Sequence, residues 1–188
     1  MVAAIRGTGA SGAYLAAMAA HWIVSNPSAV VGSIGVISAG PRVPRLLERI
    51  GVDVAERRAG RLKGMGAPWR EGTDEERANE QALVDAIYDA FVARVAKGRS
   101  LPVSRARELA TGEVWLGSKA LELGLVDEIG DLEHAVEVAA KLAGVPAKGA
   151  PVRLPRPFMA RLIQRFAAQT ATAIADQIET RIGSGPRL

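Results

Sequence analysis

The sequence predicts an α/β layer fold, in which short buried strands alternate with helices. Short apolar runs bounded by Gly, Asn and Pro indicate strands in the first 60 residues. From residue 73 onward, apolar residues at helical spacing indicate helices, and capping residues precede several of them. The 188 residues, 48% of them hydrophobic, suffice for one domain with a single core.

The first predicted elements surround a turn of small residues. The predicted order is a strand at 2–5, a turn at 7–10, a helix at 14–20, strands at 22–24 and 29–31, β-rich sequence at 32–37, a helix at 44–50 and a strand at 52–55. Ser11 therefore falls where a strand becomes a helix.

The sequence after residue 72 changes to helical patterns. Thr73 and Glu76 have capping-box spacing, and an apolar residue recurs every fourth position at Leu83, Ile87, Phe91 and Val95, which predicts a helix ending near Gly98. The remaining predictions are a helix at 103–110, a strand at 113–116, a helix at 118–123 and a helix capped by Asp131 that ends near residue 143. We interpret these elements as scaffolding for a domain that spans residues 1–144.

The end of the chain has a different composition. Four prolines predict an extended linker over residues 145–157, and apolar residues on one helical stripe predict an amphipathic helix over 158–183. Arginines gather at the start of this helix. It could dock on its own domain or a neighbouring subunit, rest on anionic lipid, or belong to a disordered tail.

Composition excludes several classes of function. The chain has no Cys and two His, too few ligands for a typical zinc site, so we expect no metal cofactor. Its net charge of +4 comes from scattered residues with few aromatics between them, so we expect no nucleic-acid partner. No apolar run approaches the ~20 residues that span a bilayer, and we expect a soluble chain without a transmembrane segment.

Ser11 has two possible roles at its strand-to-helix turn. Unpaired N–H groups at a helix start stabilise charge that develops on a bound carbonyl oxygen, so Ser11 could be a nucleophile beside such a site. Ser11 could equally be the N-cap of the helix. In the following sequence, the segment Gly32-Ser33-Ile34-Gly35 could let a peptide backbone approach closely, or its glycines could simply serve turns.

Lys63 is the second candidate for chemistry. It lies in the Gly-rich loop 58–66, and only five of the 24 basic residues of the chain are lysines. A lysine, unlike an arginine, can lose its proton and act as a general base, although its usual pKa of about 10.4 must then fall to about 7. The alternative is a surface lysine in a mobile loop.

Several motifs in unbroken order over residues 2–143 resemble signal peptide peptidase A, a family of serine peptidases with the ClpP/crotonase-like fold. They are Ala10-Ser11-Gly12-Ala13-Tyr14, Ile23-Val24-Ser25-Asn26-Pro27, Gly32-Ser33-Ile34-Gly35-Val36, Lys63-Gly64-Met65-Gly66-Ala67-Pro68-Trp69-Arg70, Thr73-Asp74-Glu75-Glu76-Arg77 and the stretch from Gly117 to Gly130.

This resemblance implies a Ser-Lys dyad without a cofactor, with Ser11 as nucleophile, Lys63 as general base and the N–H of Gly12 as an oxyanion donor. It also implies hydrolysis of signal-peptide remnants and other unfolded apolar peptides through an acyl-enzyme. The enzyme would be a ring-like homo-oligomer that shares each dyad between subunits at the extracytoplasmic face of the cell membrane. His21 and His134 are the rival bases, but neither has a companion Asp motif.

Two departures from the family pattern leave other functions open. Ala13 stands where the family usually has a glycine, and the family's upstream units, with a second oxyanion loop and a membrane anchor, precede the region of resemblance. The chain thus resembles the C-terminal two-thirds of such an enzyme, and we expect this piece alone to be inactive or poorly stable. A non-catalytic member of the fold and a crotonase-like acyl-CoA-binding enzyme are the alternatives.

Overall fold

The computed structural model describes residues 1–150 and 152. The chain divides into two units, residues 1–148 and 149–188. The predicted amphipathic helix over 158–183 lies outside the described residues, as do residues 151 and 153–157 of the predicted linker.

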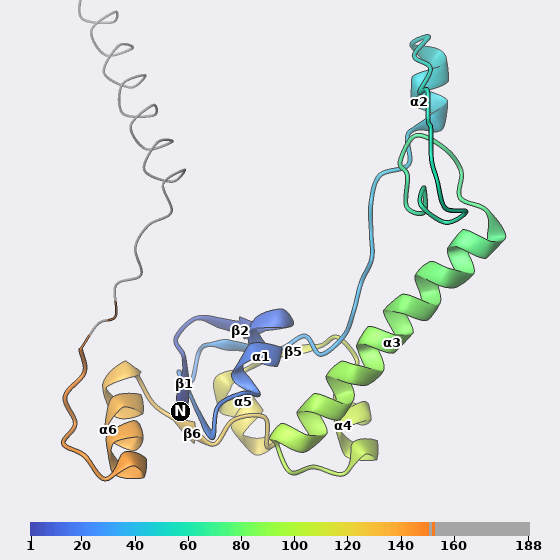
Figure 1. Cartoon of the computed structure of the whole chain (residues 1–188). Helices are drawn as coiled ribbons and strands as arrows, with labels where there is room; N and C mark the ends of the chain where they lie inside the picture. Colours follow the sequence, from blue (N-terminus) through green and yellow to red (C-terminus); the bar gives the residue numbers. More distant parts are fainter. Residues whose placement is uncertain (151, 153–188) are drawn as a thin grey trace, which may run out of the picture. The chain divides into compact units, whose positions relative to one another are not determined.

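The described residues form two small sheets surrounded by helices (Figure 1), which confirms the predicted α/β class. The strands are β1 (Val2–Ile5), β2 (Thr8–Ala10), β3 (Trp22–Ser25), β4 (Val30–Gly32), β5 (Val114–Leu116) and β6 (Glu128–Ile129). The helices are α1 (Gly12–Ala17), α2 (Pro44–Arg49), α3 (Asp74–Gly98), α4 (Val103–Leu109), α5 (Gly117–Glu122) and α6 (Leu132–Ala143). None of these helices combines the length and apolar character that a bilayer crossing needs.

The sheet order places Ser11 at the end of a strand. One sheet has the order β1-β3-β6 and is parallel throughout, and the other has the order β2-β4-β5 with β5 antiparallel to β4. The chain passes from the first sheet to the second twice, through β1 to β2 and through β3 to β4. Backbone hydrogen bonds from Asn26 to Ile5 and from Val30 to Gly7 join the two crossings. Consequently β2 is held against β4 up to the residue before Ser11.

The core lies between the sheets and the helices α1, α3, α4 and α5. Its largest fully buried side chains are Tyr14, Ile23, Ile34 and Leu125. The Tyr14 hydroxyl donates to the Leu125 carbonyl oxygen at 2.7 Å, and burial raises the pKa of this phenol. Tyr14 therefore fixes α1, and the turn before it, to the strand-side core.

Helix α3 begins and ends as its sequence predicts. The capping box forms, with the Glu76 N–H donating to Thr73 Oγ1 and the Thr73 N–H donating to Glu76 Oε2. The apolar stripe is only half buried, because Phe91 and Val95 enter the core whereas Leu83 and Ile87 are 55% and 47% exposed. The N-terminal half of α3 therefore leaves apolar side chains on the surface.

Four local predictions are wrong, and the pairing of segments with one another explains three of them. Residues 52–55 form no strand, because no other segment pairs with them among the described residues. The β-rich stretch 33–37 likewise continues as a loop beyond β4. Residues 8–10, predicted as a turn, form β2 because they pair with β4, and the predicted helix at 14–20 instead spans Gly12–Ala17.

The ion pair between His134 and Glu128 predicts a pH dependence of stability. His134 Nε2 lies 2.6 Å from Glu128 Oε2, and this hydrogen bond raises the pKa of His134 above its ordinary value of 6.5. A raised pKa means that folding favours the protonated ring, so the stabilisation is complete below pH 6.5 and declines as the pH rises through the higher folded pKa. We expect the difference in unfolding free energy between wild type and His134→Gln, from urea titrations, to shrink from pH 6 to pH 8.5. A difference that grows with pH contradicts this assignment.

Candidate functional site

Ser11 occupies a strained turn between β2 and α1. Its φ of 53° is rare for a residue with a side chain, and its N–H donates to the Gly32 carbonyl oxygen at 2.8 Å. Ser11 is the N-cap residue of α1, yet its side chain makes no capping hydrogen bond. A strained strand-to-helix turn that exposes a serine hydroxyl is a recurrent arrangement of nucleophiles. The geometry therefore favours the nucleophile over the side-chain cap.

Gly12 provides the first N–H group of α1, and helix geometry leaves this group without an intrahelical partner. A Cβ added at Gly12 would meet no atom within 4 Å, so the space beside it is open. Ala13 follows it on the exposed side of the helix. The turn thus joins an exposed hydroxyl to an N–H group that can donate to an oxyanion.

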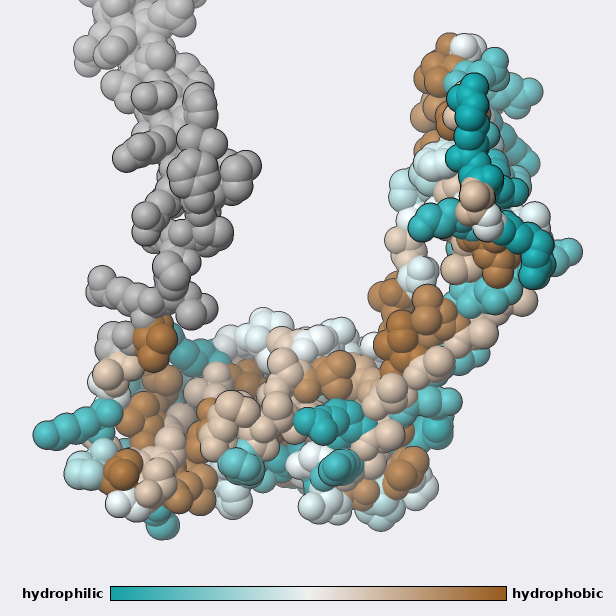
Figure 2. Space-filling model, viewed as in Figure 1, coloured by the Kyte–Doolittle hydropathy of each residue, from teal (hydrophilic) through white to brown (hydrophobic). Residues whose placement is uncertain are grey.

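A cavity of about 560 Å³ opens beside this turn. Its walls come from the start of α1, the segment after β4, the middle of α3 and the loop before β5. The lining residues are Ser11, Gly12, Leu15, Ser33, Gly35, Val36, Ile37, Ile87, Tyr88, Phe91, Ala110, Thr111 and Gly112. Figure 2 shows apolar side chains gathered over the middle of α3, the part of that helix that contributes to the wall. The cavity is therefore mainly apolar, with the Ser11 hydroxyl at its edge.

Three hydrogen bonds hold the walls of the cavity together. The Tyr88 hydroxyl donates to the Ala110 carbonyl oxygen at 2.9 Å. The N–H of Gly112 donates to the Ile34 carbonyl oxygen at 3.1 Å, and the N–H of Ser33 donates to the Glu113 carbonyl oxygen at 2.7 Å. The cavity is consequently a built feature of the fold.

The predicted segment from Gly32 to Gly35 divides between the cavity and the core. Ser33 and Gly35 line the cavity, whereas Ile34 is fully buried in the core. Gly32 has a φ of 106°, and an added Cβ would lie 2.7 Å from the Trp115 ring, so a glycine is required here by the backbone conformation and the packing of Trp115.

The sequence did not predict the cavity walls from α3 and residues 110–112, which were interpreted as scaffolding. The available signal was the run of apolar residues at every fourth position of α3, which includes Ile87.

Lys63 does not line this cavity in the structure of the single chain. Its loop is tied to the first turn of α3, because Arg70 bonds both the Gly64 carbonyl oxygen and the Glu76 carboxylate. Glu76 precedes Ile87, which lines the cavity, by about 16 Å along the helix axis. The structure therefore brings Ser11, Gly12, Ser33 and Gly35 together, and it leaves Lys63 outside the cavity, on a loop bonded to the first turn of α3.

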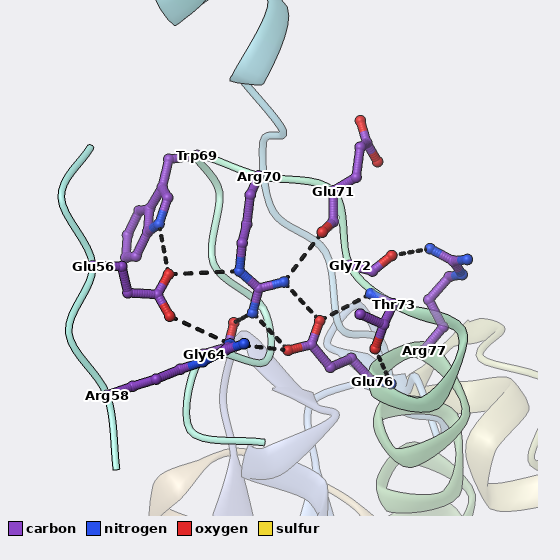
Figure 3. A network of polar contacts seen from close by, with 10 residues as sticks. All are labelled: Glu56, Arg58, Gly64, Trp69, Arg70, Glu71, Gly72, Thr73, Glu76 and Arg77. Carbon is purple, nitrogen blue, oxygen red and sulfur yellow. Dashed lines mark hydrogen bonds and ion pairs between the residues drawn. The ribbon is translucent and has the colours of Figure 1, made fainter. Parts of the chain in front are cut away.

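The loop around Lys63 is held by a network of charged groups (Figure 3). The hydrogen bonds from Arg70 and from the Thr73 N–H lower the pKa of Glu76 from 4.5 to about 2, and the Glu76 carboxylate in turn raises the pKa of Arg70. Trp69 Nε1 and Arg58 both contact the Glu56 carboxylate. This network, rather than an apolar core, defines the loop.

Neither histidine is placed to activate Ser11. His21 Nδ1 lies 2.8 Å from the N-terminal amine, and His134 pairs with Glu128 beside β6. Within residues 1–150 and 152, no group of three His, Cys, Asp or Glu side chains could hold a metal ion.

The chain matches peptidase family S49 over residues 1–146. A protein of Synechocystis sp., provisionally named as a protease, is 42% identical over 145 residues, which are 77% of this chain and 52% of that protein. A protein of Enterococcus faecium, provisionally named signal peptide peptidase SppA, is 40% identical over 134 residues, 71% of this chain and 39% of that protein. The chloroplastic serine protease SPPA of Arabidopsis thaliana is 34% identical over 147 residues, 78% of this chain and 22% of that protein.

The chain therefore spans about half, or less, of the length of these relatives. Among solved structures, an enoyl-CoA hydratase subunit of Geobacillus kaustophilus overlaps 91% of this chain and 46% of its own, with 21% identity and a TM-score of 0.37. The family match and the sequence relatives, rather than this partial overlap, identify what the chain resembles.

Proposed function

Because the chain belongs to peptidase family S49, we propose that it carries the nucleophile and the general base of a serine peptidase, namely Ser11 and Lys63. The observation that carries this proposal is the uncapped Ser11 hydroxyl, held on a strained turn at the edge of an apolar cavity.

The proposed reaction proceeds through an acyl-enzyme. Ser11 Oγ attacks the carbonyl carbon of the scissile peptide bond while a neutral Lys63 amine takes the hydroxyl proton. The N–H of Gly12 donates to the oxyanion that forms. The ammonium of Lys63 then protonates the leaving amine, and the peptide bond breaks. Water, deprotonated by the same amine, hydrolyses the ester and restores the serine.

Substrate and assembly follow from the walls of the site. An apolar cavity suits the side chain of an unfolded apolar peptide, and the name of the Enterococcus relative supports signal-peptide remnants, which arise at the membrane, as substrates. Within one chain, Lys63 does not line the Ser11 cavity, and its loop is bonded to the first turn of α3, about 16 Å along the helix axis from Ile87 in the cavity wall. We therefore propose a homo-oligomer in which Lys63 of one copy serves Ser11 of the next, working at the extracytoplasmic face of the cell membrane.

A fluorophosphonate probe tests the proposed chemistry. We expect covalent labelling at Ser11, identified by mass spectrometry, with no label in Ser11→Ala and a labelling rate at least about 100-fold lower in Lys63→Ala. The exposed residues Ser104 and Lys141 provide matched controls, and Ser104→Ala and Lys141→Ala should label at the wild-type rate. A wild-type protein without label at Ser11 favours a non-catalytic member of the family.

A further inference from the structure

Glu76 is a buried carboxylate that the proposed peptidase chemistry does not use. It lies in the first turn of α3 and is 2% exposed. A buried charge is costly unless it is paired and hydrogen-bonded. The partners of Glu76 therefore show which parts of the chain it holds together.

Glu76 binds Arg70 through both carboxylate oxygens. Arg70 Nη2 lies 2.6 Å from Glu76 Oε1, and Arg70 Nη1 lies 2.8 Å from Oε2. Glu76 Oε2 also accepts from the Thr73 N–H at 2.9 Å. Such a bidentate ion pair fixes the relative orientation of the two side chains as well as the distance between them.

Arg70 connects this pair to the residue next to Lys63. Arg70 Nη2 donates to the Gly64 carbonyl oxygen at 2.7 Å (Figure 3). A Cβ added at Gly64 would lie 2.7 Å from nitrogens of both Arg58 and Arg70, so a side chain here would have to displace the ends of these two arginines. Residues 51–72 contain neither helix nor strand, and these contacts set the path of the loop.

Arginines pair with three of the carboxylates around the loop. The pairs are Arg58 with Glu56, Arg61 with Glu75 and Arg70 with Glu76. Among the described residues, no carboxylate lies within ion-pair distance of the exposed Lys63. A carboxylate beside an amine stabilises its charged form, which cannot accept a proton. The network thus leaves the Lys63 amine without a counter-ion.

We propose that Arg70 and Glu76 are positioning residues, which hold the Lys63 loop on the first turn of α3 so that the amine is presented to a serine. This inference rests on the proposed role of Lys63 as general base. Arg70 and Glu76 act through the loop, and neither touches the reacting atoms.

Two conservative variants separate positioning from general stability. Glu76→Gln keeps the capping box, in which Gln serves as well as Glu, but loses the charge that binds Arg70. Arg70→Lys keeps a positive charge but loses the planar fork that reaches Gly64 and Glu76 together. The matched controls are Glu71→Gln and Arg61→Lys, which alter exposed ion pairs in the same region.

The measurement is the rate at which a fluorophosphonate labels Ser11. Since misplacing a catalytic group by about 1 Å can cost about 100-fold in rate, we expect Glu76→Gln and Arg70→Lys to label about 10- to 100-fold more slowly. The two controls should stay within about two-fold of wild type. In a Lys63→Ala background, Glu76→Gln should cause no further loss, because the group that it positions is already absent.

Each outcome bears on a different proposal. The positioning role is overturned if both variants are labelled at the wild-type rate. It is also overturned if Glu76→Gln lowers the labelling rate further in the Lys63→Ala background. Either result leaves the peptidase proposal standing. If the wild-type protein is not labelled at Ser11, the proposed peptidase function is overturned. The proposal that Arg70 and Glu76 position a general base is then overturned as well. Hydrogen exchange gives a second measurement, in which residues 60–68 should exchange at least about 10-fold faster in both variants while β1, β3 and α6 stay protected. If Glu76→Gln fails to fold, Arg70→Lys carries the test.

Discussion

Alanine at Ser11 or at Lys63 is expected to lower peptidase activity on an unfolded apolar peptide by about 10⁴-fold in either variant, since a nucleophile and its base act as one unit. For the same reason, the double variant should lose little more than either single variant. The measurement is cleavage of a fluorogenic peptide, with Ser104→Ala and Lys141→Ala as controls at wild-type activity.

Mixing the two inactive chains provides the sharper test. If each site takes Ser11 from one copy and Lys63 from the next, random assembly of equal amounts restores about one quarter of the sites in a ring. The physical reason is that Lys63 does not line the Ser11 cavity of its own chain, since its loop is bonded to the first turn of α3 and the cavity lies at the middle of that helix. The expected result is therefore a rise from background to about 25% of wild-type activity after co-assembly.

A double variant carrying both substitutions is the control for this mixing, because it supplies neither residue. Its mixture with the Ser11→Ala chain should remain at background. If co-assembled rings of the two single variants also show only background peptidase activity, the dyad lies within one chain. The proposed sharing of the dyad between copies would then be wrong.

The largest expected effect on stability is that of Asp127→Ala. Asp127 accepts two hydrogen bonds from Arg99, at 2.8 and 2.7 Å, and a third from the Ile23 N–H at 2.7 Å. The two side chains are 9% and 18% exposed, so removal of the carboxylate leaves the Arg99 guanidinium nearly buried without its partner. We expect the free energy of unfolding to fall by about 3–5 kcal/mol, measured by urea titration.

A surface pair and a paired replacement serve as controls for this loss. Glu108→Ala removes the partner of Arg105 in a pair whose side chains are 63% and 45% exposed, and it should cost at most about 1 kcal/mol. The double variant Arg99→Met with Asp127→Leu should be more stable than Asp127→Ala alone, because no charge remains buried. Equal losses in Asp127→Ala and Glu108→Ala would contradict the assignment.

Local signals in the sequence were sufficient for the bounds of α3 and α6. The capping box at Thr73 fixes the start of α3, and Asp131 and Gly144 bound α6, with Gly144 in the left-handed conformation. These features depend on residues within one turn of each other, so they can be recognised without a partner. The strand predictions were only partly correct, because a strand forms only where another segment pairs with it. The apolar run 52–55 has no such partner and is a loop, whereas Thr8–Ala10 pair with β4 and form β2.

By itself, the sequence determined the α/β class, the bounds of α3 and α6, the family, and the placing of Ser11 between a strand and a helix. Only the tertiary structure decided that α3 and residues 110–112 complete the cavity, because packing alone brings these segments beside α1. It also decided that Lys63 lies outside the Ser11 cavity, because the Arg70–Glu76 pair holds its loop on the first turn of α3 whereas the cavity lies at the middle of that helix. Spacing along the chain contains no information on such distances, because they arise from how distant segments fold onto one another.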